Sequence, residues 1–154
     1  MPAGILTLYS KNKDRLNPGD VAGAAVKIAL ITSVYAPDAT VTGNSLFADV
    51  SANEISTAGQ TGYTAGGIAL ATVVATGVTG GFKLSSSSPV WTAATGPIPA
   101  HRYYVMYVLG TLWGRVNPLI GYFLGDSTPA DVPATTVGNT LTVTVPAGGW
   151  FDAT

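Results

Sequence analysis

The feature that most constrains this fold is the segment Arg102–Leu109, which reads RYYVMYVL. Every residue after Arg102 is apolar or aromatic, so a strand here presents apolar side chains on both of its faces. One face can pack on the core, and the other must meet a second layer or a neighbouring subunit. The segment therefore predicts a layered β-protein, and it places Tyr104 among the candidate interface residues.

Other segments also have the composition of strands. Val26–Val34 is β-branched and largely apolar on both faces, whereas Thr140–Val145 alternates between threonine and apolar residues and has one buried side. Further strands are expected at Ile68–Val78, Phe82–Leu84, Pro89–Thr92 and Leu119–Leu124. Gly, Pro, Ser and Asn between these segments supply turns. The pattern predicts a mainly β fold, a jelly-roll-like sandwich or barrel.

The N-terminal region has a different pattern. Ile5–Leu16 is spaced as a strand that runs into a short helix, and the helix is expected to end at Asn17–Asp20, which contains Pro18. We therefore expect an N-terminal arm over residues 1–20 and a single β domain over residues 21–154. Within the domain, one helical turn is expected near Ser51–Ile55, with Ser51 and Glu54 forming a capping box.

The paired glycines Gly66 and Gly67 precede the apolar run that begins at Ile68. Paired glycines at a strand entry usually supply a positive φ or a close approach between backbones, and Tyr63 can cover such a turn with its ring. We interpret this pair as architectural, so Gly67→Val is expected to hinder folding.

Charge is scarce along the chain. Seven Lys and Arg oppose eight Asp and Glu, which leaves no basic surplus for binding nucleic acid. Charged residues are 10% of the sequence, against about 25% in a typical soluble domain. The segment Ile55–Phe82 carries no charge, but its many Gly, Thr and Ser residues argue against a membrane span. Low charge favours association, so we expect a homo-oligomer, a trimer or dimer.

No catalytic or metal-binding pattern is present. The single histidine, His101, has no G-x-S-x-G elbow, and one histidine with no cysteine excludes a zinc site. Asp126 and Asp131 lie in a loop where aspartate commonly stabilises turns, which is preferred over a loosely bound calcium ion. We assign no catalytic, cofactor-binding or metal-binding residues, and expect no enzymatic activity.

The most concentrated positive charge lies near the N-terminus, at Lys11, Lys13 and Arg15. Two interpretations remain open, a solvated helix face and a contact with an acidic partner surface. Together with nearby apolar residues and two aromatic residues from the β region, this cluster forms the candidate interface. The candidate interface residues are Leu6, Leu8, Tyr9, Lys11, Lys13, Arg15, Tyr104 and Trp113.

Ordered blocks of sequence suggest a family. They are VKIALITSVYAPD, FADVSANEIS, GYTAGGIAL, SPVWTA, AHRYYVMYV, PLIGYFLGD and LTVTVPAGGWFDAT. From about Val26 to the end, the chain resembles a group of small virion structural proteins of tailed bacteriophages. The resemblance implies a non-enzymatic capsid decoration, or cement, protein on the outer capsid surface, bound to the major capsid protein.

Two segments depart from the family pattern. Ala71–Ser88 has Lys83 as its only charge, and Gly110–Asn117 carries Trp113 where a polar loop is usual. Both departures make the surface more apolar and are consistent with extra subunit contacts. The alternative function is a tail-associated receptor- or glycan-binding module, which would place exposed aromatic residues in its loops as stacking platforms. The direction of the aromatic side chains separates the two functions.

Overall fold

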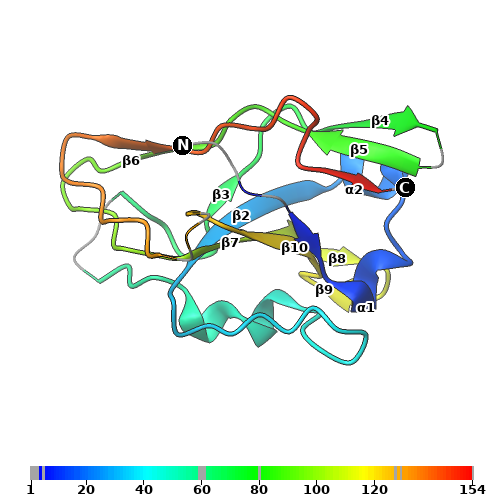
Figure 1. Cartoon of the computed structure of the whole chain (residues 1–154), viewed down its shortest axis with the longest axis horizontal. Coiled ribbons are helices and arrows are strands. Elements are labelled where there is room, and N and C mark those ends of the chain that lie inside the picture. The colour runs from blue at the N-terminus through cyan, green and yellow to red at the C-terminus, as the bar shows by residue number, and fades with distance from the viewer. Residues whose placement is uncertain are drawn as a thin grey trace.

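A five-stranded antiparallel sheet forms the centre of the protein (Figure 1). The computed structural model describes residues 4, 6–58, 62–79, 81–126, 128 and 130–153. The strand order in the central sheet is β1-β10-β7-β2-β3. These strands are β1 (Thr7–Leu8), β10 (Leu119–Leu124), β7 (Tyr103–Leu109), β2 (Ala25–Ile31) and β3 (Ile68–Ala69).

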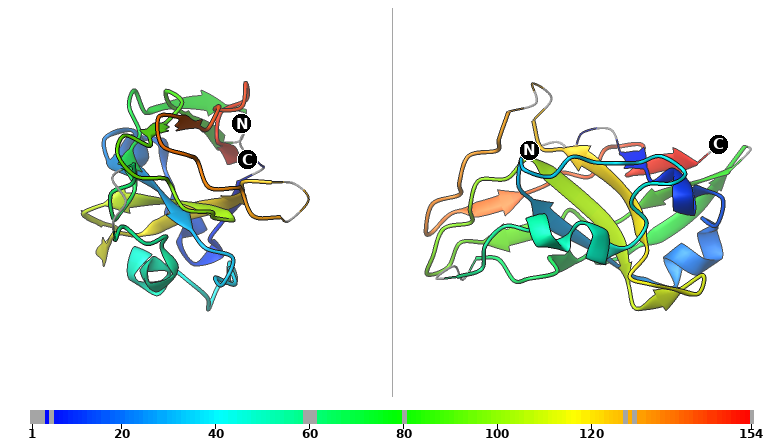
Figure 2. Two further views of the ribbon diagram at one scale, coloured as in Figure 1. Left: turned by 90° about the vertical axis from the view of Figure 1, so that its left-hand side faces the viewer. Right: turned by 90° about the horizontal axis from the view of Figure 1, so that it is seen from below.

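Three smaller antiparallel sheets accompany the central one, and in Figure 2 two of them lie on one side of it. None of the sheets closes into a barrel within the described residues, so the chain is mainly β with open antiparallel sheets. One has the order β12-β5-β4, from Phe151–Ala153, Gly81–Ser85 and Val74–Val78. The others pair β11 (Thr140–Thr142) with β6 (Val90–Thr92), and β8 (Thr111–Leu112) with β9 (Arg115–Val116).

Both faces of β7 are buried by the chain itself. Tyr104, Met106 and Val108 belong to the core cluster shared with the small sheets. Val105 and Tyr107 belong to a second cluster with Phe47 and other residues of the segment 32–50. Phe47 stacks on Tyr107, with ring centroids 4.1 Å apart and an interplanar angle of 12°. The second layer expected over this strand is therefore an internal one.

Two short α-helices and two 3-10 turns complete the fold, where a short helix before Asn17 and one helical turn near Ser51 were expected. The helices are α1 (Ser10–Lys13) and α2 (Pro18–Ala22), and the 3-10 turns are Phe47–Asp49 and Ser51–Asn53. The turn at Ser51 lies where it was expected, but it has no side-chain cap. The Glu54 carboxylate instead accepts hydrogen bonds from the Tyr63 hydroxyl and the Gly66 N–H, at 2.5 and 2.6 Å.

The expected N-terminal arm is instead part of the domain. The strand β1 pairs with β10, and Tyr9 is fully buried. Asn12 is also fully buried, and its Nδ2 donates to the carbonyl oxygens of Ser45 and Leu119 at 2.7 and 2.9 Å. A detached segment would remove the side-chain donor from both carbonyls and expose the Tyr9 ring, although the Ser45 carbonyl would keep the Leu119 N–H at 2.9 Å. Residues 6–22 are therefore integral to the core, and no boundary falls at residue 20.

The paired glycines have the geometry that their sequence predicted. Gly66 and Gly67 have φ values of +81° and +72°. A Cβ atom on Gly67 would overlap the carbonyl oxygen of Ile28 and lie 2.7 Å from the Cα atom of Ala29. The Tyr63 hydroxyl accepts the Leu30 N–H at 3.0 Å, which ties this turn to β2.

Candidate interaction surface

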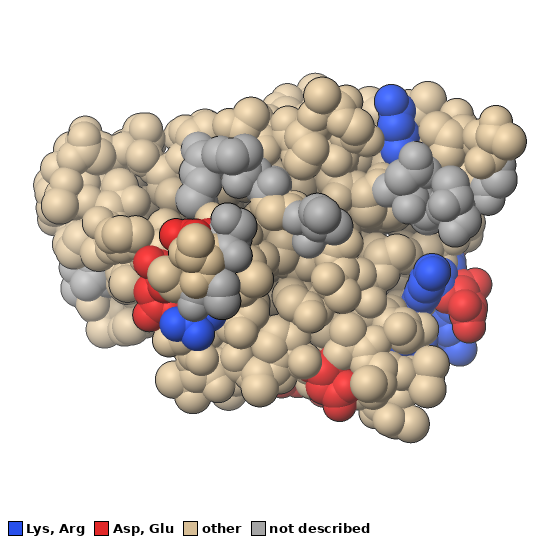
Figure 3. Space-filling model, viewed as in Figure 1, with Lys and Arg blue, Asp and Glu red and all other residues tan. Residues whose placement is uncertain are grey.

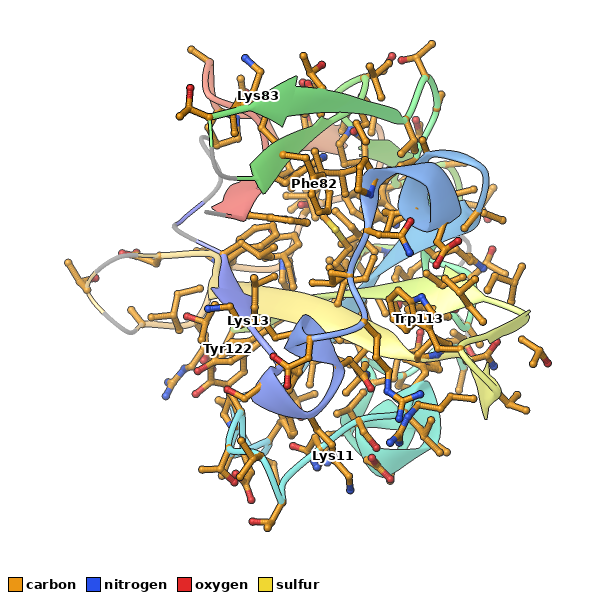
Figure 4. The ribbon with its side chains drawn as sticks, turned by 90° about the vertical axis from the view of Figure 1, so that its right-hand side faces the viewer. Lys11, Lys13, Phe82, Lys83, Trp113 and Tyr122 are labelled. Carbon is orange, nitrogen blue, oxygen red and sulfur yellow. The ribbon has the colours of Figure 1, made fainter. Side chains whose placement is uncertain are left out.

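Lys11 and Lys13 lie at one end of the molecule, where Figure 4 shows Lys13 near Tyr122 and Trp113 on the opposite side of α1. We call Lys11, Lys13, Arg15 and Trp113 the basic end. Lys13 and Arg15 are exposed, and Lys11 is half-buried. The Lys11 ammonium donates to the Gly43 carbonyl at 3.3 Å. The Arg15 guanidinium donates to the Trp113 carbonyl at 3.2 Å, across 98 positions of sequence.

Trp113 is fixed in an unusual conformation within this end. Its φ of +55° lies in the left-handed region, which costs a bulky residue about 1–3 kcal/mol. The indole N–H donates to the Asp20 carboxylate at 2.9 Å, while Arg15 holds the Trp113 carbonyl. Asp20 also accepts from the Asn17 side-chain amide. Trp113 is thus half-buried, packs against the main core as Leu8 does, and is held from two sides by the N-terminal segment.

Asp20 was not among the residues selected from the sequence. It and Trp113 are separated by 93 positions, so no local spacing indicates their contact. The local signal at Asp20 is its place in the first turn of α2, where the Asn17 side chain caps its N–H at 2.9 Å. This cap explains why α2 begins at Pro18, but it does not predict the hydrogen bond between Asp20 and the Trp113 indole.

Three of the candidate interface residues are core residues and are corrected here. Tyr9 and Tyr104 have no exposed surface, and Leu6 is 8% exposed. Tyr104 stacks on Phe123 with ring centroids 4.9 Å apart, and the Tyr9 hydroxyl lies 2.7 Å from that of Tyr35. These side chains have no surface to offer a partner. Leu8 is half-buried and packs against the main core.

Much of the remaining surface carries no charge, as the broad uncharged area in Figure 3 shows. Arg102 and Asp131 form an ion pair at 2.8 Å. Asp38 and Asp126 cap their own loops by accepting from the side chains and N–H groups of Thr40 and Thr128. These hydrogen bonds lower the pKa of both carboxyl groups. Arg102, Asp131, Asp38 and Asp126 therefore stabilise their own loops and local contacts. The uncharged surface includes exposed valines such as Val34.

The histidine lies in the core. His101 is 1% exposed, with Nδ1 3.1 Å from the Pro99 carbonyl and Nε2 2.8 Å from the Tyr104 hydroxyl. An Nδ1–H that donates to the carbonyl leaves Nε2 to accept from the tyrosine, which is the neutral imidazole. Burial lowers the His101 pKa and raises that of Tyr104. The pair acts as a buried structural contact.

One small hollow lies between β3 and β6, with a volume of about 200 Å³. Its lining residues are all uncharged: Gly62, Thr64, Gly67, Ile68, Val90, Trp91 and Thr92. It is smaller than the roughly 300–1,000 Å³ of typical ligand sites and holds no acid or base. Within the described residues, no three metal-ligating side chains gather, and no helix is long and apolar enough to cross a membrane.

Comparison of the chain with protein-family models, curated proteins and solved structures gives no match.

Proposed function

We propose that this chain is a non-enzymatic structural protein of a tailed-bacteriophage virion, a decoration or cement protein on the outer capsid surface. In this proposal the basic end contacts the major capsid protein, and the chain acts as part of a homo-oligomer. The observation that carries the contact is the convergence of Arg15, Asp20 and Trp113 on one surface. The family resemblance of the sequence blocks supplies the virion context.

The basic end has the properties of a binding surface. Trp and Arg are the residues most enriched among those that dominate interface energies. The indole is already oriented by Asp20, so binding would immobilise little further side-chain freedom. Lys13 and Arg15 add exposed positive charge, which speeds the approach to an acidic surface. The acidic-partner interpretation of this segment is therefore the one that we favour.

The burial of the aromatic residues argues for this function over the glycan-binding alternative. Trp91 and Trp150 are 4% and 3% exposed, and Tyr104 is fully buried. A stacking platform needs exposed rings clustered in loops, and the described residues provide Trp113 alone among the tryptophans. The jelly-roll-like arrangement stays part of the proposal, supported by the mainly antiparallel sheets.

The test is to locate the protein in purified particles and then to reverse charge at the basic end. Lys13 is exposed, and its side chain forms no hydrogen bond or ion pair with the part of the chain that the structure describes, so Lys13→Glu should leave the fold intact. We expect Lys13→Glu to weaken attachment about three- to tenfold at 0.15 M salt, because a rim charge contributes about 0.2–1 kcal/mol and its reversal adds repulsion. Lys83→Glu, on β5 and outside the basic end, is the matched control.

Electron microscopy of the particles would give both the position and the occupancy of the protein. The proposal requires density on the outer capsid with the basic end facing the shell. Absence of the protein from purified particles would overturn the function. Equal attachment of Lys13→Glu and the Lys83→Glu control would overturn the assigned surface.

A further inference from the structure

The strand β4 is an edge with free backbone groups. It pairs with β5 alone in the sheet β12-β5-β4, and no other backbone hydrogen bond to β4 is present among the described residues. The Leu84 carbonyl of β5 accepts the Trp150 N–H, so the polar groups of Leu84 point toward β12 and away from β4. Because these directions alternate along a strand, the Lys83 groups point toward β4.

This alternation fixes which groups of β4 are unpaired. Lys83 lies opposite Thr76, and Leu84 lies opposite Ala75. The Thr76 backbone therefore bonds to β5, whereas the N–H and C=O groups of Ala75 and Gly77 point to the open side. A Cβ atom on Gly77 would meet nothing within 4 Å, so the face of the strand at Gly77 is uncovered as well.

The edge lacks the usual protection against pairing. Val74–Val78 contains no charge and no proline, and Val74 is 51% exposed. Natural edge strands are commonly blocked by charged residues, proline or a covering segment. The helix α2 lies on the inner side of the hairpin, where Val21 shares the core cluster with Leu84 and Ala75 packs against it (Figure 4). Val74, Thr76 and Gly77 stay exposed beside this helix.

We propose that β4 pairs antiparallel with β4 of a second copy of this chain. The sequence VATGV is suited to this pairing, because a two-fold axis at Thr76 sets each copy's Thr76 opposite that of the other. Ala75 then faces Gly77 of the second copy, and their outward N–H and C=O groups bond reciprocally. Val74 faces Val78 of the second copy, so two apolar pairs flank the threonines.

The charges nearby permit the pairing. Lys83 is the only charged residue of Ala71–Ser88, and it lies one strand away from Thr76. In the paired state the two Lys83 positions are three strand spacings apart, roughly 14 Å. That separation exceeds the Debye length of about 8 Å at physiological salt, so the two ammonium groups are screened from each other.

This pairing rests on the proposed function and deepens it, because it selects a two-fold contact for the expected homo-oligomer. A single short strand pair buries much less than the roughly 1,200 Å² of a stable interface. The dimer is therefore weak in dilute solution. Subunits held close together on a particle surface have a much higher effective concentration, which would shift the equilibrium toward the paired state.

This sequence contains no cysteine, so single introduced thiols allow a direct test. In the proposed register, Thr76→Cys brings two thiols opposite each other, with Cβ atoms about 4.5–5.5 Å apart. This is slightly longer than the Cβ separation in a disulfide, and a small shift of the strands closes it. Thr140→Cys places an exposed thiol on the short strand β11 and is the matched control.

We expect Thr76→Cys to form an intermolecular disulfide in a glutathione redox buffer at least tenfold faster than Thr140→Cys at equal concentration. Sedimentation velocity should show a concentration-dependent dimer for the unmodified chain and a monomer for Thr76→Lys, which sets two charges against each other. Equal cross-linking rates for the two cysteine variants would overturn the proposal, as would an unchanged sedimentation profile for Thr76→Lys. Both measurements are made without particles, so their failure is distinct from a failure of capsid attachment.

Discussion

Replacing Gly67 tests how β2 approaches the turn before β3. The residue has φ +72°, and a Cβ atom there would overlap the Ile28 carbonyl oxygen and lie 2.7 Å from the Ala29 Cα atom. Both obstacles are backbone atoms of β2 in the middle of the central sheet. They cannot move without displacing a strand that pairs with β7 along its whole length. The smallest substitution, Gly67→Ala, should therefore destabilise the fold, and Gly67→Val more so.

The expected cost has two separable parts. A non-glycine residue in the left-handed region costs about 1–2 kcal/mol. Forcing an extra methyl group into packed structure adds about 1–3 kcal/mol, so the total for Gly67→Ala is about 2–5 kcal/mol. Gly114 has φ +71° and nothing within 4 Å of its Cβ position, so Gly114→Ala measures the backbone part alone. The difference between the two variants isolates the collision with β2.

Urea unfolding followed by tryptophan fluorescence provides the free energies. With a urea dependence of about 2 kcal/mol per molar, Gly67→Ala should lower the midpoint by roughly 1–2.5 M. Gly114→Ala should lower it by less than about 1 M. If both variants unfold at the same midpoint, the close approach of Gly67 to β2 contributes nothing and the reasoning fails.

Four further predictions concern the N-terminal segment and buried polar groups. Asn12→Ala should destabilise the fold by about 1–3 kcal/mol, because the Leu119 carbonyl loses its side-chain donor while the Ser45 carbonyl keeps the Leu119 N–H. Deletion of residues 1–16 should unfold the domain, as circular dichroism would show. Tyr63→Phe should cost about 1–3 kcal/mol in urea unfolding, because the buried Leu30 N–H loses its acceptor. Burial lowers the pKa of His101 in the folded state, so below about pH 6.5 the unfolded chain binds a proton that the folded chain does not. Stability should therefore decline as the pH falls from 7 to 5.5, and a urea midpoint in His101→Gln that is equally pH-dependent would contradict this.

Strands with a continuous apolar pattern were predicted closely from the sequence. The predicted Leu119–Leu124 matches β10, and Arg102–Leu109 differs from β7 by one residue. The expected strand over Ile68–Val78 is wrong in one respect, because it divides into β3 and β4, which belong to different sheets. Thr72 lies between them at φ +51°, and its type gives no sign of a left-handed conformation.

Short strands escaped prediction for a related reason. The β8–β9 hairpin has two residues in each strand, too few to show a periodicity. Its turn depends on Trp113 at a positive φ, which a tryptophan rarely adopts. The strand β12 also went unpredicted, since Phe151–Ala153 is too short for an alternating pattern to emerge. Pairing with β5 defines this strand, and that pairing joins residues far apart in the sequence, such as Leu84 and Phe151.

Among the candidate interface residues, the exposure expected of Lys13 and Arg15 is observed, whereas Leu6, Tyr9 and Tyr104 are buried. Lys13 and Arg15 are exposed, because burying an unpaired cation is costly. Tyr9 is buried because its hydroxyl pairs with that of Tyr35, which in turn donates to the Asn44 side chain at 2.8 Å. Burial of a tyrosine thus depends on a partner 26 positions away, which residue type alone does not reveal.

The two apolar faces of β7 could be covered either by a second layer of the same chain or by a neighbouring subunit. In this structure the segment 32–50 covers the second face, so the layer is internal. Phe47 and Tyr35 cover the second face, so β7 no longer provides a reason for self-association. The scarcity of charge remains such a reason, since it acts on whatever surface is left uncovered. In this fold that surface includes the edge strand β4, which no charged residue or proline protects. Its unpaired backbone N–H and C=O groups can form hydrogen bonds with a strand of another chain. Any self-association of this chain should therefore depend on an edge of the small sheet, and substitutions on the buried faces of β7 should affect folding first.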